Sequence, residues 1–119
     1  MSPDRSVLYD SADSFFTLSG SVVMKLTPAA AIQVCREAAR RGIMVLRVEG
    51  GIWHSPGFEA RIDCIWDGAD PPTNQAKAHD NNVRAARFIQ AESSVHSAFI
   101  LTTTSITGES YRASKQSAP

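Results

Sequence analysis

The sequence predicts a small α+β domain, an open-faced sandwich in which an antiparallel sheet carries two helices on one face. Three observations predict it: a length of 119 residues, which suits one domain, two segments with helical periodicity, and three apolar segments with the composition of strands. The expected order is α-β-β-α-β, with an extra N-terminal strand if the segment before Thr27 pairs with the sheet.

The first helix is expected over residues 27–41. Thr27 is a suitable N-cap, and Pro28 fits the first helical position, where a missing N–H costs nothing. Gly42 is placed to end the helix, and the two arginines before it favour the negative end of the helix dipole. One apolar face is expected from Ala31, Val34, Cys35 and Ala38.

Two strands are expected over residues 43–49 and 58–66, joined as an antiparallel hairpin by the turn-forming segment 50–57. In the second strand, alternation predicts a buried face opposite a charged face that carries Glu59, Arg61 and Asp63. The members of the buried faces are expected to be Met44, Leu46 and Val48 in the first strand, and Phe58, Ala60, Ile62, Cys64 and Trp66 in the second.

A polar connection over residues 67–79 is expected to lead into a second helix over residues 81–92. Asp80 or Asn81 would cap this helix, and residues 98–104 would form the last strand because they are apolar and β-branched. The inner side of the helix is expected to carry Ala85, Ala86, Phe88 and Ile89.

The sequence divides into three parts. Residues 1–23 are a polar leader that is either disordered or adds an edge strand through residues 21–26. Residues 24–107 are expected to form the domain, and residues 108–119 a flexible tail, because they contain no aliphatic residue larger than alanine.

Composition excludes several classes of protein. Lys and Arg number 12, and Asp and Glu number 12, so the chain is not a strongly basic nucleic-acid binder. The sequence contains neither an apolar run long enough to span a membrane nor a secretory signal. We therefore expect a cytoplasmic protein in which Cys35 and Cys64 are buried and reduced.

The sequence contains no catalytic signature and no nucleotide-binding glycine motif. His54, His79 and His96 lie in different segments and are expected to be exposed loop residues. Asp63, Asp67 and Asp70 could in principle bind a hard cation, but they lack the glycine and bidentate glutamate of a calcium loop. We therefore expect no enzyme activity, no cofactor and no metal site.

Charge is distributed unevenly along the chain. Between Glu49 and Asp70 five acidic residues face one arginine, whereas between Lys25 and Gly42 four basic residues face one glutamate. The acidic segment is either an ordinary solvated sheet face or a docking surface for a basic partner, with Trp53 as an aromatic anchor and Trp66 turned inward. The candidate binding residues are Glu49, Trp53, Glu59, Asp63, Asp67 and Asp70.

Several motifs resemble the immunity protein of colicin E5. They begin with Met24-Lys25-Leu26-Thr27-Pro28, Ala30-Ala31-Ile32, Val34-Cys35 and Glu37-Ala38-Ala39, and continue with Gly42, Gly50-Gly51, Trp53, Pro56-Gly57-Phe58, Trp66, Pro71, Asn81-Asn82 and Ala98-Phe99-Ile100. The resemblance covers about 80 of the 119 residues, from Met24 to about Thr103. Its most specific part is the Gly-Gly-x-Trp-x-x-Pro-Gly-Phe segment at residues 50–58.

The resemblance implies a cytoplasmic antitoxin that binds the basic C-terminal domain of a toxin that cleaves tRNA anticodons. The acidic residues would imitate phosphates in the RNA-binding groove, and Trp53 or Trp66 would imitate a base. The toxin would be a colicin or, because this chain is neutral, a diverged toxin of a contact-dependent inhibition system. The antitoxin would be a monomer or weak dimer that contacts neither nucleic acid nor membrane. The alternative function is a small RNA-binding module that uses the open sheet face.

Overall fold

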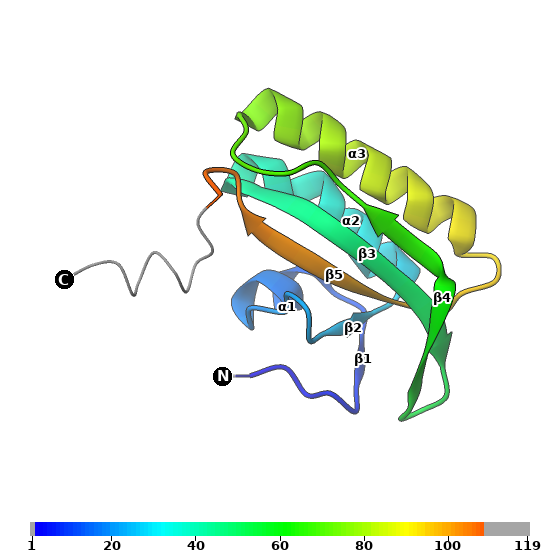
Figure 1. Cartoon of the computed structure of the whole chain (residues 1–119). Helices are drawn as coiled ribbons and strands as arrows, with labels where there is room; N and C mark the ends of the chain where they lie inside the picture. Colours follow the sequence, from blue (N-terminus) through cyan, green and yellow to red (C-terminus); the bar gives the residue numbers. More distant parts are fainter. Residues whose placement is uncertain (1, 109–119) are drawn as a thin grey trace.

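A computed structural model describes residues 2–108, and it is an α+β open-faced sandwich as the sequence predicts (Figure 1). The five-stranded sheet has the order β1-β2-β5-β3-β4 and is antiparallel except for the β1–β2 pair, which is parallel. The strands are β1 (Leu8–Tyr9), β2 (Lys25–Leu26), β3 (Ile43–Trp53), β4 (Phe58–Asp67) and β5 (Ala98–Ser105). Beyond Gly108, the expected flexible tail lies outside the described residues.

Two helices, α2 (Pro28–Ala38) and α3 (Gln75–Glu92), lie side by side on one face of the sheet (Figure 1). The main core lies between this layer and the sheet, and the inner face expected for α2 is fully buried. No helix in the described part of the chain combines the length and the apolar character needed to cross a bilayer. The largest buried side chains of the main core are Phe99, Met24, Leu26, Ile89, Leu101, Val34, Val45 and Val48.

Helix α2 begins and ends as its sequence predicts. The Thr27 side chain accepts a hydrogen bond from the backbone N–H of Ala30, and Pro28 occupies the first turn. A short 3-10 turn (Ala39–Arg41) follows, and Gly42 ends it with a φ of 74°, in the left-handed region that favours glycine.

The segment before Met24 is folded against the domain. It forms the edge strand β1 and the short helix α1 (Ala12–Thr17), whose Ala12 and Phe15 are buried in the main core. The Arg41 guanidinium lies 4.0 Å from the centre of the Phe16 ring, a cation–π contact between α1 and the end of α2.

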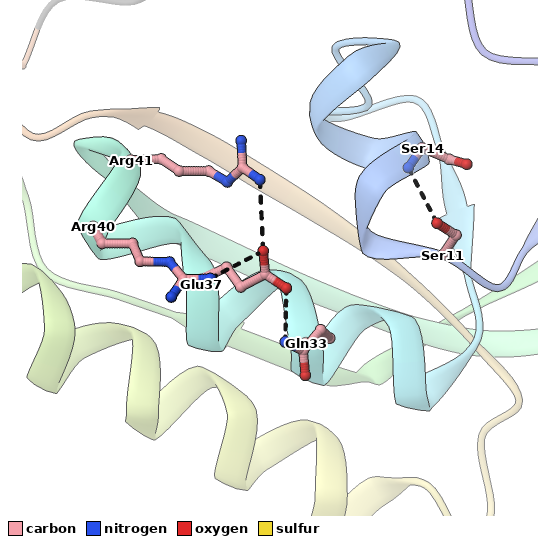
Figure 2. A network of polar contacts seen from close by, with 6 residues as sticks. All are labelled: Ser11, Ser14, Gln33, Glu37, Arg40 and Arg41. Carbon is pink, nitrogen blue, oxygen red and sulfur yellow. Dashed lines mark hydrogen bonds and ion pairs between the residues drawn. The ribbon is translucent and has the colours of Figure 1, made fainter.

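Glu37 on α2 forms ion pairs with two arginines at the end of the helix, as Figure 2 shows. Glu37 pairs with Arg40 and Arg41 at 3.5 and 3.6 Å and accepts a 2.7 Å hydrogen bond from Gln33. The Gln33 hydrogen bond, followed by the two arginines, lowers the pKa of Glu37. In the same view, Ser11 caps α1 by accepting a hydrogen bond from the backbone of Ser14.

Helix α3 begins earlier than the sequence predicts. Its N-cap is Asn74, whose side chain accepts a 2.8 Å hydrogen bond from the backbone N–H of Lys77, so the expected cap at Asp80 or Asn81 is wrong. Asn81 and Asn82 resemble capping residues in sequence, but both are buried inside the helix. The last five residues of the connection expected over residues 67–79 are therefore helical.

The side chains of Asn81 and Asn82 hydrogen-bond to the part of β3 that β4 does not reach. Strand β4 pairs with β3 only from Arg47 onward, so the backbone of residues 43–45 has no partner in β4. Asn82 accepts from the Val45 N–H at 2.9 Å and donates to the Ile43 carbonyl at 3.1 Å. Asn81 donates to the Val45 carbonyl at 2.8 Å. These side chains satisfy backbone groups that would otherwise be buried without partners.

Replacing Asn82 with alanine leaves the buried N–H of Val45 and the partly buried carbonyl of Ile43 without their partners. We expect Asn82→Ala to lower the free energy of unfolding by about 2–4 kcal/mol, measured by urea denaturation. Gln90→Ala, at an exposed position of the same helix, is the control and should change it by less than about 0.5 kcal/mol. Equal losses in the two variants would contradict the role assigned to Asn82.

Candidate functional site

The β3–β4 hairpin carries five of the six candidate binding residues. Its tip extends beyond the helical layer in Figure 1. Glu49 and Trp53 lie on β3, Glu59, Asp63 and Asp67 lie on β4, and Asp70 lies in the connection to α3. Strand β3 runs to Trp53, so Gly50 and Gly51 are strand residues rather than part of the expected loop, and the turn is limited to residues 54–57.

A large irregularity in β4 determines which way these side chains point. Glu49 pairs with Ile65, but Gly51 pairs with Ala60, so residues 61–64 all stand opposite Gly50. Such an insertion changes the alternation of side chains between the two faces of a strand. The side chains of β4 before residue 61 and after residue 64 therefore do not alternate between the two faces in a single pattern.

The expected buried face of β4 is wrong for this reason. Cys64 is buried and Trp66 packs against the main core, but Ile62 is 91% exposed. Phe58 lies on the other face, where its ring would be 2.9 Å from a Cβ atom placed on Gly51. The expected buried face of β3 is interrupted as well, because a bulge between Val45 and Arg47 turns Val45, rather than Leu46, into the main core.

The open sheet face of the hairpin brings three of the candidate residues together. Glu49 and Trp53 are four residues apart on the same side of β3, and Asp67 is paired with Arg47 on that side. Trp53 is half-buried, and its backbone N–H donates to the Ser97 hydroxyl at 2.8 Å. This face also carries residues that the acidic pattern did not single out, namely Phe58, Ile65 and Ile100.

The other three candidate residues lie apart from this group. Glu59 pairs with Ile52 in the ladder, so its side chain leaves the strand on the face opposite Trp53. Asp63 is exposed on the irregular part of β4, and Asp70 is exposed beyond the end of that strand. The six residues therefore surround the hairpin and the segment after it, rather than forming one flat patch.

Two of the five carboxylates are held in exposed ion pairs. The Arg47 Nε lies 2.7 Å from the Asp67 Oδ1, and this hydrogen bond raises the pKa of Arg47. Glu59 contacts His54 at 2.8 Å and Arg61 at 3.0 Å. The His54 hydrogen bond, followed by the charge of Arg61, lowers the pKa of Glu59.

The remaining carboxylates, Glu49, Asp63 and Asp70, form no ion pair within residues 2–108. Surface ion pairs contribute little to stability and exchange readily with a binding partner, so even the paired carboxylates remain available for recognition. The segment 47–70 holds five carboxylates against two arginines and keeps a net negative charge. The segment is therefore an acidic surface that also carries aromatic side chains.

Comparison with known proteins identifies the family. The family model for the colicin E5 immunity protein, described as "Colicin-E5 Imm protein", matches residues 24–104, which include the whole hairpin and both large helices. The chain belongs to the colicin E5 immunity protein family. Its most specific motif, at residues 50–58, forms the end of β3, the turn and the start of β4.

Named relatives of this immunity protein come from two bacteria. The chain is 56% identical to the immunity protein CdiI of Burkholderia pseudomallei over 108 residues, which is 91% of this chain and 99% of the relative. It is 39% identical over 80 residues to the colicin E5 immunity protein of Escherichia coli, and equally to the colicin E5 immunity protein in ColE9. Each of these two matches covers 66% of this chain and 96% of the relative.

Gly51 permits the close approach of the two hairpin strands. A Cβ atom at Gly51 would collide with the backbone carbonyl of Glu59 and lie 2.9 Å from the Phe58 ring. We expect Gly51→Ala to lower the free energy of unfolding by about 1–3 kcal/mol. Gly57→Ala in the same hairpin is the control, because the nearest atom, the His54 Cβ, is 3.9 Å away.

Thermal and urea unfolding of the two variants measure this difference. Gly57→Ala should stay within about 0.5 kcal/mol of the parent protein. A Gly51→Ala variant as stable as Gly57→Ala would show that the hairpin tolerates a side chain between its strands.

Proposed function

We propose that this chain is an antitoxin that binds and inhibits a tRNA-anticodon ribonuclease toxin like colicin E5. The observation that carries the proposal is the family match over residues 24–104. Immunity proteins inhibit toxins rather than act as enzymes, so the chain would act by occupying a surface, without a catalytic residue or a cofactor. It would work in the cytoplasm, as a monomer or weak dimer when free.

The proposed partner is the basic C-terminal tRNase domain of the toxin. Such a domain must present Lys and Arg side chains to RNA phosphates, so a surface with carboxylates suits its binding groove. Glu49 and Trp53 on the open face would be the centre of the interface, with Trp53 buried where a base would stack. Glu59, Asp63, Asp67 and Asp70 would supply the surrounding negative charge.

The toxin belongs either to the colicins or to the contact-dependent inhibition systems. The similarity to CdiI favours the second class, because it is higher in identity and extends over 99% of that relative. The proposed docking face includes Ile65 and Ile100 as well as charges, so apolar contacts would contribute to the affinity.

The alternative, an RNA-binding module that uses the open sheet face, lacks support from the charges on that face. RNA binding on a sheet requires basic and aromatic side chains that stack on bases and contact phosphates. Arg47 is paired with Asp67 on that face, and Glu49 would repel phosphate. The open face is therefore better suited to a basic protein than to RNA.

Reversing the charge of Glu49 and Asp63 tests the interface. We expect Glu49→Lys with Asp63→Lys to weaken binding of the cognate nuclease domain by about 2–4 kcal/mol and to lower the association rate, measured by surface plasmon resonance. Added salt should slow association of the parent protein more than that of the double variant. Asp13→Lys, a charge reversal at an exposed position of α1, is the matched control. Unchanged affinity in the folded double variant would remove both residues from the interface.

A cleavage assay tests inhibition itself. The purified chain should block cleavage of tRNA by the nuclease domain encoded beside its gene, reach full inhibition at a 1:1 ratio, and show no turnover. The same preparation should leave tRNA unshifted in a gel without toxin. A tRNA shift by the chain alone, together with undiminished cleavage, would favour the RNA-binding alternative.

A further inference from the structure

Three side chains with metal-binding atoms meet behind the hairpin. Cys64 on β4, Glu92 at the end of α3 and His96 before β5 each offer one ligand atom, and the three atoms lie within 4.8 Å of one another. Sulfur, carboxylate oxygen and imidazole nitrogen are all ligands of zinc. The residues are far apart in sequence, so only the fold brings Cys64 to the other two.

His96 has a buried ring nitrogen without a hydrogen-bond partner. Its side chain is 10% exposed, which corrects the expectation of an exposed loop histidine. The Nδ1 atom lies 3.1 Å from a carboxylate oxygen of Glu92, but the geometry does not form a hydrogen bond. Buried polar atoms without a partner are rare and require an explanation, and an ion between the two groups would supply one.

The spacing of the ligand atoms suits a small tetrahedral ion. With a Zn–S bond of about 2.3 Å and Zn–N and Zn–O bonds of about 2.0 Å, ligand atoms around zinc lie about 3.3–3.7 Å apart. The Nδ1 of His96 and the carboxylate oxygen of Glu92 are 3.1 Å apart, and all three ligand atoms lie within 4.8 Å of one another. Glu92 is 32% exposed and gives an ion access from solvent, whereas Cys64 is fully buried.

The Cys64 sulfur occupies space that a glycine of β3 leaves open. Gly50 makes room for Cys64, because a Cβ at that position would collide with the sulfur. Burial, followed by the charge of Glu92, raises the pKa of the Cys64 thiol to about 11.

We propose that Cys64, Glu92 and His96 form a site for a thiophilic divalent cation, with zinc as its best candidate. Binding breaks the S–H bond, releases the proton to solvent and forms a metal–sulfur bond, while water completes the fourth position. Magnesium and calcium are excluded by the sulfur ligand. The ion would tie the irregular part of β4 to the end of α3 and the start of β5.

This site is independent of the proposed antitoxin activity. None of its ligands belongs to the candidate binding residues, although Asp63 is adjacent to Cys64 in the chain. The ion would add to the contacts between elements that already share the main core, in which Cys64 of β4, Ile89 of α3 and Phe99 of β5 lie. Its measurable consequence is a more stable protein when zinc is present.

The test uses the full chain, reduced and stripped of metal with a chelator. Isothermal titration calorimetry with ZnCl2 should show one ion bound per chain. Thermal unfolding should show a higher Tm when the protein is saturated with zinc. Titration with CoCl2 should produce the sulfur-to-cobalt charge-transfer absorption of a thiolate ligand. Cys64→Ser, Glu92→Gln and His96→Gln should each weaken zinc binding by at least about tenfold.

Matched controls separate this site from adventitious binding. Cys35→Ala removes the other buried cysteine, and His79→Gln removes an exposed histidine of α3, so both variants should bind zinc like the parent protein. Zinc affinity that is unchanged in Cys64→Ser and His96→Gln would overturn the proposal. Absence of the charge-transfer absorption in the unmodified chain would also overturn it. This measurement does not depend on whether any variant folds.

Discussion

The hydrogen bonds from Asn81 and Asn82 to the backbone of β3 are the constraint on which the rest of the structure depends. They let α3 cover the edge of β3 before Arg47, where β4 does not pair with it, and they place the helix against the sheet at a defined position along the strand. Asn81 also accepts a hydrogen bond from the backbone of Ala69, so the connection after β4 is held by the same side chain. The hairpin is therefore anchored at its base, where backbone polar groups would otherwise be buried without partners.

From this base the hairpin extends as a structure with two different faces. The four residues of β4 that stand opposite Gly50 reverse the alternation, so Cys64 and Trp66 turn toward the helices while Phe58 lies on the open side. Irregularities of this kind bend a strand and leave exposed side chains in unusual positions. Here the result is an exposed Ile62 beside charged neighbours, on a strand that is also the edge of the sheet. An irregular, charged edge resists pairing with other strands.

Charge in this protein is arranged locally, although the chain as a whole is neutral. The arginines at the end of α2 are held by Glu37, and one of them also packs on Phe16. On the hairpin, Arg47 and Arg61 hold two carboxylates in exposed pairs, which leaves Glu49, Asp63 and Asp70 without ion pairs in the described residues. For the proposed antitoxin, such an arrangement would direct a basic partner to the hairpin through long-range attraction, while the aromatic and aliphatic side chains of the open face would supply contact area.

The sequence by itself determined the elements whose signals are local: the α+β class, the limits of α2, the approximate positions of β3, β4 and β5, and the motif at residues 50–58. Caps, helical spacing and turn residues act over a few positions, so these predictions hold. The start of α3 and the faces of the hairpin were decided only by tertiary structure. Asn81 and Asn82 resemble helix caps until β3 is beside them, and the side chains of β4 cannot be assigned to a face without its partner strand. Both depend on backbone groups far away in the chain, which no local pattern encodes.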